Sequence, residues 1–364
     1  RALTRAGMEA GAFGLTSGLF YAPGSYAELD EVIELARVAA EYGGAYTSHI
    51  RDESDYTIGL VAAVEEVIRV AEEARLPGVV THLKALGPRV WGYSSAVIHR
   101  IERARERGVE IFADQYPYMA SATSLVAALV PRWAEVGGHD SLVARIEDRD
   151  VRSRLREGMA ENLDRRGGAD RIQFRRFEPD VSIEGRTLAD VAREAGLDPL
   201  DMAMELMKQG NPGIVSFNMH PDDVARIMKE PWVMTCTDGD LVPLGEGVPH
   251  PRSYGAFSRK LSRYVRDDGV IGLEHAVRSM TSLPATVFGM RDRGVVREGA
   301  VADLVVFDLA GVQDMATFND PHHYSRGMAY VIVNGEVAID GGEFSGALPG
   351  RVLSLRDQAP TARD

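Results

Sequence analysis

Three polar residues recur at nearly equal intervals in the first third of the chain. His49, His82 and Asp114 lie 33 and then 32 residues apart, and each marks the end of a short apolar segment. Between these segments, apolar residues are three and four positions apart, which is the spacing of amphipathic helices. Strands and helices that alternate with this period are typical of consecutive right-handed βαβ units. The chain is therefore constrained to an α/β fold with a parallel sheet.

The same pattern places the individual elements. Ser25 is a plausible N-cap for the first helix of the series, and Gly43 and Gly44 end that helix. Polar residues that end successive strands favour a (β/α)8 barrel with its site at the rim, although an open doubly wound sheet fits the alternation too. No glycine-rich dinucleotide or phosphate loop opens a helix. The strands expected are 11–20, 45–50, 78–84, 109–118 and 230–240, with helices at 26–42, 57–75 and 94–108.

The regular alternation stops near residue 121 and gives way to other patterns. Residues 1–121 are interpreted as barrel βα units, and 122–229 as an insertion subdomain with one further strand at 213–220. Asn334-Gly335 between alternating apolar runs predicts a hairpin. The remaining segments are the last barrel strand and helices (230–291), a small β-sandwich module (292–350) and a tail (351–364). A closed barrel needs eight parallel strands, and five or six segments qualify, so the early strands are expected to precede Arg1.

Composition excludes several classes of protein. The 364 residues carry a net charge of −13 without a basic stripe, which argues against a nucleic-acid partner. No apolar run is long enough to span a membrane, and no signal peptide opens the chain. The single cysteine, Cys236, fits a reducing compartment and predicts a cytoplasmic protein.

Two histidines and one aspartate are the first candidates for chemistry. His49 and His82 end neighbouring strands, so their imidazoles should converge at the rim, as ligands of a first-row metal or as hydrogen-bonded rim residues. Asp238 follows the last predicted strand in Thr237-Asp238-Gly239. It could act as a general base, or it could form an Asx turn before the glycine.

A second polar set is expected at the same rim. Lys84 follows His82 by two residues and shares its face, and Tyr116, Tyr118 and Arg252 complete the set. An arginine fork and a tyrosine hydroxyl suit a substrate carboxylate, whereas the alternative is a solvated rim.

These motifs, taken in order, resemble a known family. The chain is similar to the N-acyl-D-amino-acid deacylases (D-aminoacylases) of the metal-dependent amidohydrolase superfamily, from about residue 1 to 350. The resemblance implies a (β/α)8 barrel with an insertion and a small β-sandwich, and hydrolysis of N-acyl-D-amino acids to a carboxylate and a free D-amino acid. The motifs that carry it are GAFGLTSGLFYAPGSYA, TSHIRDE, THLKALGPRVWG, ADQYPY, TDGD, HPRSYGAFSR, VADLVVFD, DMATFNDP and YVIVNGE.

The resemblance also implies roles for the candidate residues. His49 and His82 match the histidines that hold one tightly bound Zn²⁺, and a second metal is left open. Asp238 matches the catalytic carboxylate. Lys84, Tyr116 and Arg252 match positions near a small-molecule substrate, with Arg252 as the partner of its carboxylate.

Departures from the family pattern leave alternatives open. The family's first His-x-His pair and its cysteine zinc ligand would precede residue 1, so the chain looks like the C-terminal two-thirds of an amidohydrolase. An N-terminal fragment of the same protein would then be the partner that completes the barrel. A family serine near the substrate aligns at Ala122. The alternative functions are cyclic amide hydrolysis, as in hydantoinases and dihydroorotases, and a non-catalytic incomplete barrel.

Overall fold

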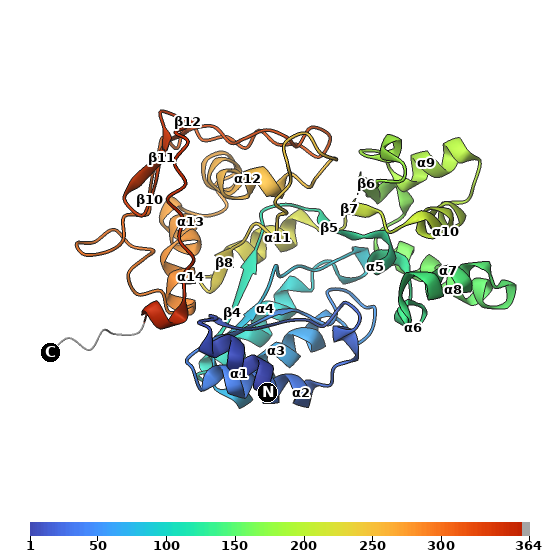
Figure 1. The fold of residues 1–364 in the computed structure, drawn as a ribbon, viewed down its shortest axis with the longest axis horizontal. Coiled ribbons are helices and arrows are strands. Elements are labelled where there is room, and N and C mark those ends of the chain that lie inside the picture. Colours follow the sequence, from blue (N-terminus) through green and yellow to red (C-terminus); the bar gives the residue numbers. More distant parts are fainter. Residues whose placement is uncertain (359–364) are drawn as a thin grey trace.

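A computed structural model describes residues 1–358, and its central layer is a five-stranded parallel sheet (Figure 1). The strand order is β1-β2-β3-β4-β8, so β8 pairs directly with β4 although a long segment separates them in sequence. This arrangement confirms the predicted α/β class and parallel sheet. The strands are β1 (Gly14–Gly18), β2 (Ala45–His49), β3 (Gly78–Val80), β4 (Ile111–Gln115) and β8 (Val233–Thr235).

Helices connect the first four strands and cover the sheet. They are preceded by α1 (Ala2–Glu9) and comprise α2 (Leu29–Ala40), α3 (Leu60–Ala74) and α4 (Ser94–Glu106). Their apolar stripes are buried against the strands in one cluster that includes Ile33, Val64 and Ile101. The expected alternation of strands and helices is therefore confirmed for this part of the chain.

Two local expectations are wrong. Ser25 does not cap a helix: Gly24–Tyr26 forms a short 3₁₀ turn, and α2 begins at Leu29, where Asp30 and Glu31 face the positive end of the helix dipole. The strand expected at 78–84 ends at Val80, because His82 adopts a left-handed backbone with a φ of 39° that no strand accommodates.

The insertion has its own sheet and its own apolar core. Its antiparallel strands are β5 (Ser121–Ser124), β6 (Ile172–Arg176) and β7 (Gly213–Ser216), in the order β5-β7-β6. Only β7 coincides with a predicted strand. The helices are α5 (Leu125–Leu129), α6 (Arg132–Glu135), α7 (Gly138–Glu147), α8 (Arg149–Arg165), α9 (Leu188–Ala195) and α10 (Pro199–Gln209). The next helix, α11 (Pro221–Met228), packs against α4 beside the parallel sheet.

The last part of the chain lies across the parallel sheet from the insertion (Figure 1). It contains α12 (Arg252–Arg259), a π-helical segment (Lys260–Asp267), α13 (Leu273–Met280) and α14 (Ser282–Val287). A four-stranded antiparallel sheet follows, with β9 (Leu304–Phe307), β10 (Met328–Val333), β11 (Glu336–Asp340) and β12 (Glu343–Phe344). The predicted hairpin is confirmed, because Asn334 and Gly335 connect β10 to β11 with φ angles of 51° and 83°.

The remaining regular segments are short 3₁₀ turns at Pro88–Val90, Ala169–Arg171, Val181–Ile183 and Leu355–Gln358. Of the predicted tail, 359–364 lie outside the described residues. The domain limits drawn from the sequence stay predictions. In the described part of the chain, no helix combines the length and the apolar character needed to cross a bilayer.

Candidate functional site

A small cavity of about 180 Å³ opens where the carboxyl ends of the parallel strands meet the insertion. Five of the six predicted site residues line this cavity, and the sixth, Arg252, forms an ion pair with one of them. The structure thus brings the whole predicted set together. The lining residues are Phe20, Tyr21, His49, Glu53, His82, Lys84, Leu86, Tyr116, Ser121, Ala122, Thr123, Arg166 and Asp238.

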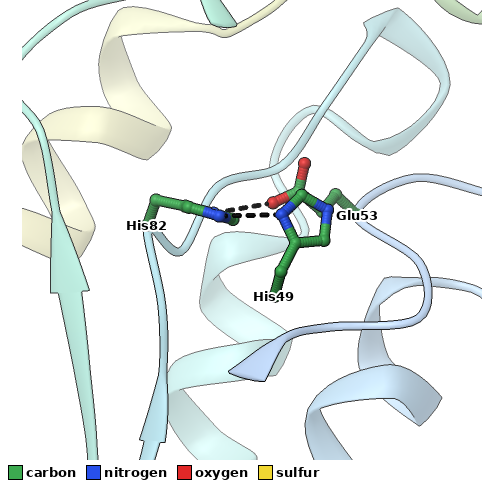
Figure 2. A group of neighbouring side chains, drawn as sticks. All are labelled: His49, Glu53 and His82. Carbon is green, nitrogen blue, oxygen red and sulfur yellow. Dashed lines mark hydrogen bonds and ion pairs between the residues drawn. The ribbon is translucent and has the colours of Figure 1, made fainter. Parts of the chain in front are cut away.

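The two histidines face each other, as Figure 2 shows. His49 is the last residue of β2, and His82 follows β3 by two residues. Their nearest ring nitrogens, His49 Nδ1 and His82 Nε2, are 2.8 Å apart, and the ring centroids are 4.5 Å apart. This convergence follows from the pairing of β2 with β3 in parallel register.

Glu53 completes a compact group with the two imidazoles. One ligand atom from each of the three residues lies within 4.8 Å of the others. Glu53 Oε1 is 3.0 Å from His82 Nδ1 and also accepts from the Lys84 ammonium. Burial alone would raise the pKa of Glu53, but attraction to the Lys84 ammonium and the hydrogen bond from His82 outweigh it and hold the pKa well below its usual range. The carboxylate is therefore ionised.

The donor set fits a first-row divalent cation. When His82 Nδ1–H donates to Glu53, Nε2 keeps its lone pair and points at His49, which is the carboxylate–histidine arrangement found around protein-bound zinc. Burial lowers the pKa of His49 to about 3, so its imidazole is neutral and able to ligate a metal. Lys84 Nζ lies 2.7 Å from His82 Nδ1, and both groups share Glu53 Oε1 as their acceptor, so Lys84 holds the carboxylate that orients the ring.

Two aspartates, one half-buried and one buried, hold the loops that carry these residues. Asp114 on β4 accepts the backbone N–H of His82 at 2.6 Å. Asp52 accepts the backbone N–H groups of Ser54, Thr57 and Gly59 at 2.6 to 3.0 Å, which folds the loop after β2 around Glu53. The ligand geometry thus depends on backbone hydrogen bonds to carboxylates that do not contact the cavity.

On the other side of the cavity, Asp238 meets Arg252. Asp238 follows β8, and its Oδ2 lies 2.8 Å from Nη1 of Arg252 at the start of α12. The Arg252 guanidinium lies over the ring of Tyr116, 4.6 Å from the centroid. The Tyr116 hydroxyl is buried without a hydrogen-bond partner among the described residues, and burial raises its pKa well above 10.0. Tyr116 is therefore a neutral hydroxyl that can donate to a ligand.

Backbone strain is concentrated at this site. Four non-glycine residues of the described chain have positive φ, and two of them are His82 and Asp238, with φ of 39° and 48°. Strained residues of this kind persist where surrounding contacts over-determine them, and they are enriched at functional sites.

Two charged residues of the cavity, Glu53 and Arg166, were not predicted. Glu53 lies four residues after His49 in the TSHIRDE motif, and its distance from His49 was the available signal. Arg166 comes from the C-terminal end of α8, within a segment whose many charges indicate a solvated surface. No signal in the sequence connects Arg166 to the cavity, because only the fold of the insertion brings it there.

Comparison with known proteins agrees with this geometry. A model described as the amidohydrolase family matches residues 1–339. An N-acyl-D-glutamate deacylase of Alcaligenes xylosoxydans xylosoxydans is 38% identical over 90% of this chain and 58% of its own length. A D-aminoacylase of the same organism is 35% identical over 97% of this chain and 64% of its own length.

A solved structure extends the comparison to the fold. The N-acyl-D-glutamate deacylase from Bordetella bronchiseptica, complexed with zinc and a phosphonate inhibitor, aligns with a TM-score of 0.76. It is 39% identical, and the alignment covers 93% of this chain and 62% of that one. The chain belongs to the amidohydrolase family, within its D-aminoacylase branch. It spans less than two thirds of the length of each of these relatives.

Proposed function

We propose that the protein hydrolyses the amide bond of N-acyl-D-amino acids in a zinc-dependent reaction. The observation that carries this proposal is one small cavity with two converging imidazoles on one side and the Asp238–Arg252 pair on the other. Relatives named for deacylation of N-acyl-D-amino acids over nearly the whole chain support it. We also propose that the five parallel strands are part of a (β/α)8 barrel, with the cavity at its C-terminal rim.

His49 and His82 would hold the zinc, and Glu53 would orient His82. When bound there, zinc supplies a Lewis acid that polarises a carbonyl and lowers the pKa of a water towards about 7. Glu53 is engaged by Lys84, so its main contribution is to fix the tautomer and direction of the His82 ring.

Asp238 would act as the general base and then as the general acid. Its carboxylate accepts a proton from the attacking water and later delivers a proton to the departing nitrogen. The neutral Tyr116 hydroxyl, which has no hydrogen-bond partner in the described part of the chain, would donate to the carbonyl oxygen as negative charge develops on it.

Arg252 would anchor the substrate's α-carboxylate with the help of Lys84. Nη1 of Arg252 forms the ion pair with Asp238, yet Nη1 and Nε are both buried without a hydrogen-bond partner among the described residues. The N–H groups of the guanidinium form the fork that suits a carboxylate. An anchored carboxylate favours an N-acyl-amino acid over a cyclic amide without a carboxylate, such as hydantoin.

The test is hydrolysis of paired N-acetyl-D- and N-acetyl-L-amino acids by the full-length zinc-loaded protein, with hydantoin and dihydroorotate as cyclic competitors. We expect turnover of the D-substrates only. Asp238→Asn should lower kcat by about 10² to 10⁴, the usual contribution of a general base. The matched control is Asp240→Asn, two residues away, which loses only an ion pair with Arg175. Undiminished turnover in Asp238→Asn, or activity confined to the cyclic amides, would contradict the proposal.

A further inference from the structure

The cavity contains a buried arginine that the reaction described above does not use. Arg166 follows the last residue of α8, so it belongs to the insertion rather than to the parallel sheet. Only 1% of its surface is exposed, yet its side chain lines the same cavity as His49 and Asp238. Two parts of the chain with separate apolar cores thus contribute charge to one small volume.

Arg166 has no counter-ion among the residues that the structure describes. Its Nε donates to the carbonyl oxygen of Ala128 at 3.3 Å, and its Nη1 is buried without a hydrogen-bond partner among residues 1–358. The other cations differ in this respect, because Lys84 is paired with Glu53 and Arg252 with Asp238.

Its sequence neighbour, Arg165, provides a useful contrast. Arg165 forms an ion pair with Asp55 at 3.1 Å and donates to Asn162 at 2.7 Å. A guanidinium is always charged, and burial of an unpaired charge is strongly unfavourable. The position of Arg166 is therefore suited to an anion that arrives from outside the chain.

The cavity wall around Arg166 is also polar. Ser121 and Thr123 on β5 contribute hydroxyl groups, and the Thr123 hydroxyl lies 3.1 Å from that of Tyr21. A volume of about 180 Å³ corresponds to roughly six water molecules. The space therefore suits a short polar group better than a long apolar one.

We propose that Arg166 is the counter-ion of a second carboxylate on the substrate, so that the preferred substrates are N-acyl-D-amino acids with two carboxylates. This inference rests on the proposed function, in which Arg252 already binds the α-carboxylate. The second carboxylate could belong to the side chain, as in D-glutamate and D-aspartate, or to a dicarboxylic acyl group such as succinyl. The relatives' names differ on this point, since one is a D-glutamate deacylase and another a D-aminoacylase.

The experiment compares kcat/KM for two isosteric pairs with the full-length zinc-loaded protein. The pairs are N-acetyl-D-glutamate against N-acetyl-D-glutamine, and N-succinyl-D-alanine against its succinamoyl analogue. We expect the charged member of one pair to be preferred by about 100-fold, since leaving a buried charge unpaired is costly. The pair that shows the preference identifies the source of the carboxylate.

Variants connect the preference to the residue. Arg166→Met should abolish the preference through loss of the charged substrate, while kcat/KM for the amide analogue changes less than threefold. Arg165→Met, the matched control, should keep the preference. Ratios near one for both pairs in the unmodified protein overturn the inference alone, even if Arg166→Met fails to fold. Absence of hydrolysis of any N-acyl-D-amino acid overturns the proposed function and this inference with it.

Discussion

At the residue scale, Glu53 connects Lys84 to His82, which we propose as a zinc ligand. Glu53→Gln removes the ionised acceptor of both Lys84 and His82, so the ring loses the group that fixes its tautomer. We expect zinc affinity to fall about 10- to 100-fold. Competition with a chromophoric chelator measures this. Asp55→Asn is the control, because Asp55 lies on the same loop but pairs outward with Arg89 and Arg165. Equal affinities of the two variants would contradict the assigned role.

A second residue predicts how stability depends on pH. Lys260 is buried, its Nζ lies 2.7 Å from Thr235 Oγ1 and 2.8 Å from Ser279 Oγ, and burial lowers its pKa to about 7. Between pH 7 and the unfolded pKa of 10.5, the unfolded chain binds a proton that the folded chain does not. The free energy of unfolding should therefore rise with pH in this window, by up to about 1.4 kcal/mol per pH unit from this group.

Urea unfolding at pH 7, 8 and 9 checks this expectation. The free energy of unfolding of the unmodified protein should rise with pH relative to that of Lys260→Met. The free energy of unfolding of Lys208→Met, a change on α10, should vary with pH in the same way as that of the unmodified protein. A difference that stays constant over this range would show that Lys260 does not titrate in the window.

The site residues were predictable from sequence to different degrees. His49 and His82 could be predicted because the repeat of the strands and their position at strand ends together fix their place in a parallel sheet. Glu53 lies in an irregular loop. The sequence alone does not distinguish a buried acid of the site from a solvent-exposed acid there, because the position of Glu53 depends on Asp52 and its three backbone hydrogen bonds. Arg166 depends on tertiary folding of a distant segment, which no local pattern encodes.

At the element scale, the loop after β3 touches the end of α8 through Gly87. Gly87 has a φ of 96°, its N–H donates to the carbonyl of Asn218 at 2.7 Å, and an added Cβ would lie 1.9 Å from the carbonyl oxygen of Arg165. Gly87→Ala must therefore displace the end of α8. We expect a loss of at least about 2 kcal/mol in the free energy of unfolding, since positive φ and backbone overlap act together.

Gly92→Ala is the matched control for this change. Gly92 has a similar φ of 88°, but an added Cβ there would meet no atom within 4 Å. Its cost should be limited to the conformational penalty of about 1 kcal/mol. Denaturant unfolding of both variants measures the two values, and equal losses would exclude the steric contribution at Gly87.

Elements whose apolar residues recur with a clear period were predicted, and elements without such a period were missed. Helices α3 and α4 lie within the expected ranges because their apolar stripes repeat at helical spacing. Strand β5, of sequence SATS, is short and polar, and β6 ends in two arginines, so neither resembles a buried strand. Both become strands because they pair with β7 on either side.

At the scale of the whole molecule, the candidate metal site and the packing that holds the parallel sheet are separate contributions. The sheet is held by apolar side chains such as Ile33, Val64 and Ile101 and by backbone pairing of its strands, and neither requires a metal. Removal of zinc with dipicolinate should therefore abolish hydrolysis while the far-UV circular dichroism spectrum stays unchanged. The melting temperature should fall only by the linkage contribution of zinc binding, and added zinc should restore activity. Loss of secondary structure on chelation would contradict this separation.

The pairing of β4 with β8 has a consequence for how this scaffold can diversify. Gln115 and Thr235 are adjacent partners, so the ends of the long intervening segment are already joined by the sheet. The parallel sheet that carries both imidazoles is therefore continuous from β4 to β8 without that segment. The segment between β4 and β8 could therefore be replaced as a unit, and the replacement would place a different cation, or none, at the position of Arg166. A change in that segment would thus alter the charge beside the two imidazoles while the parallel sheet that carries them stays the same.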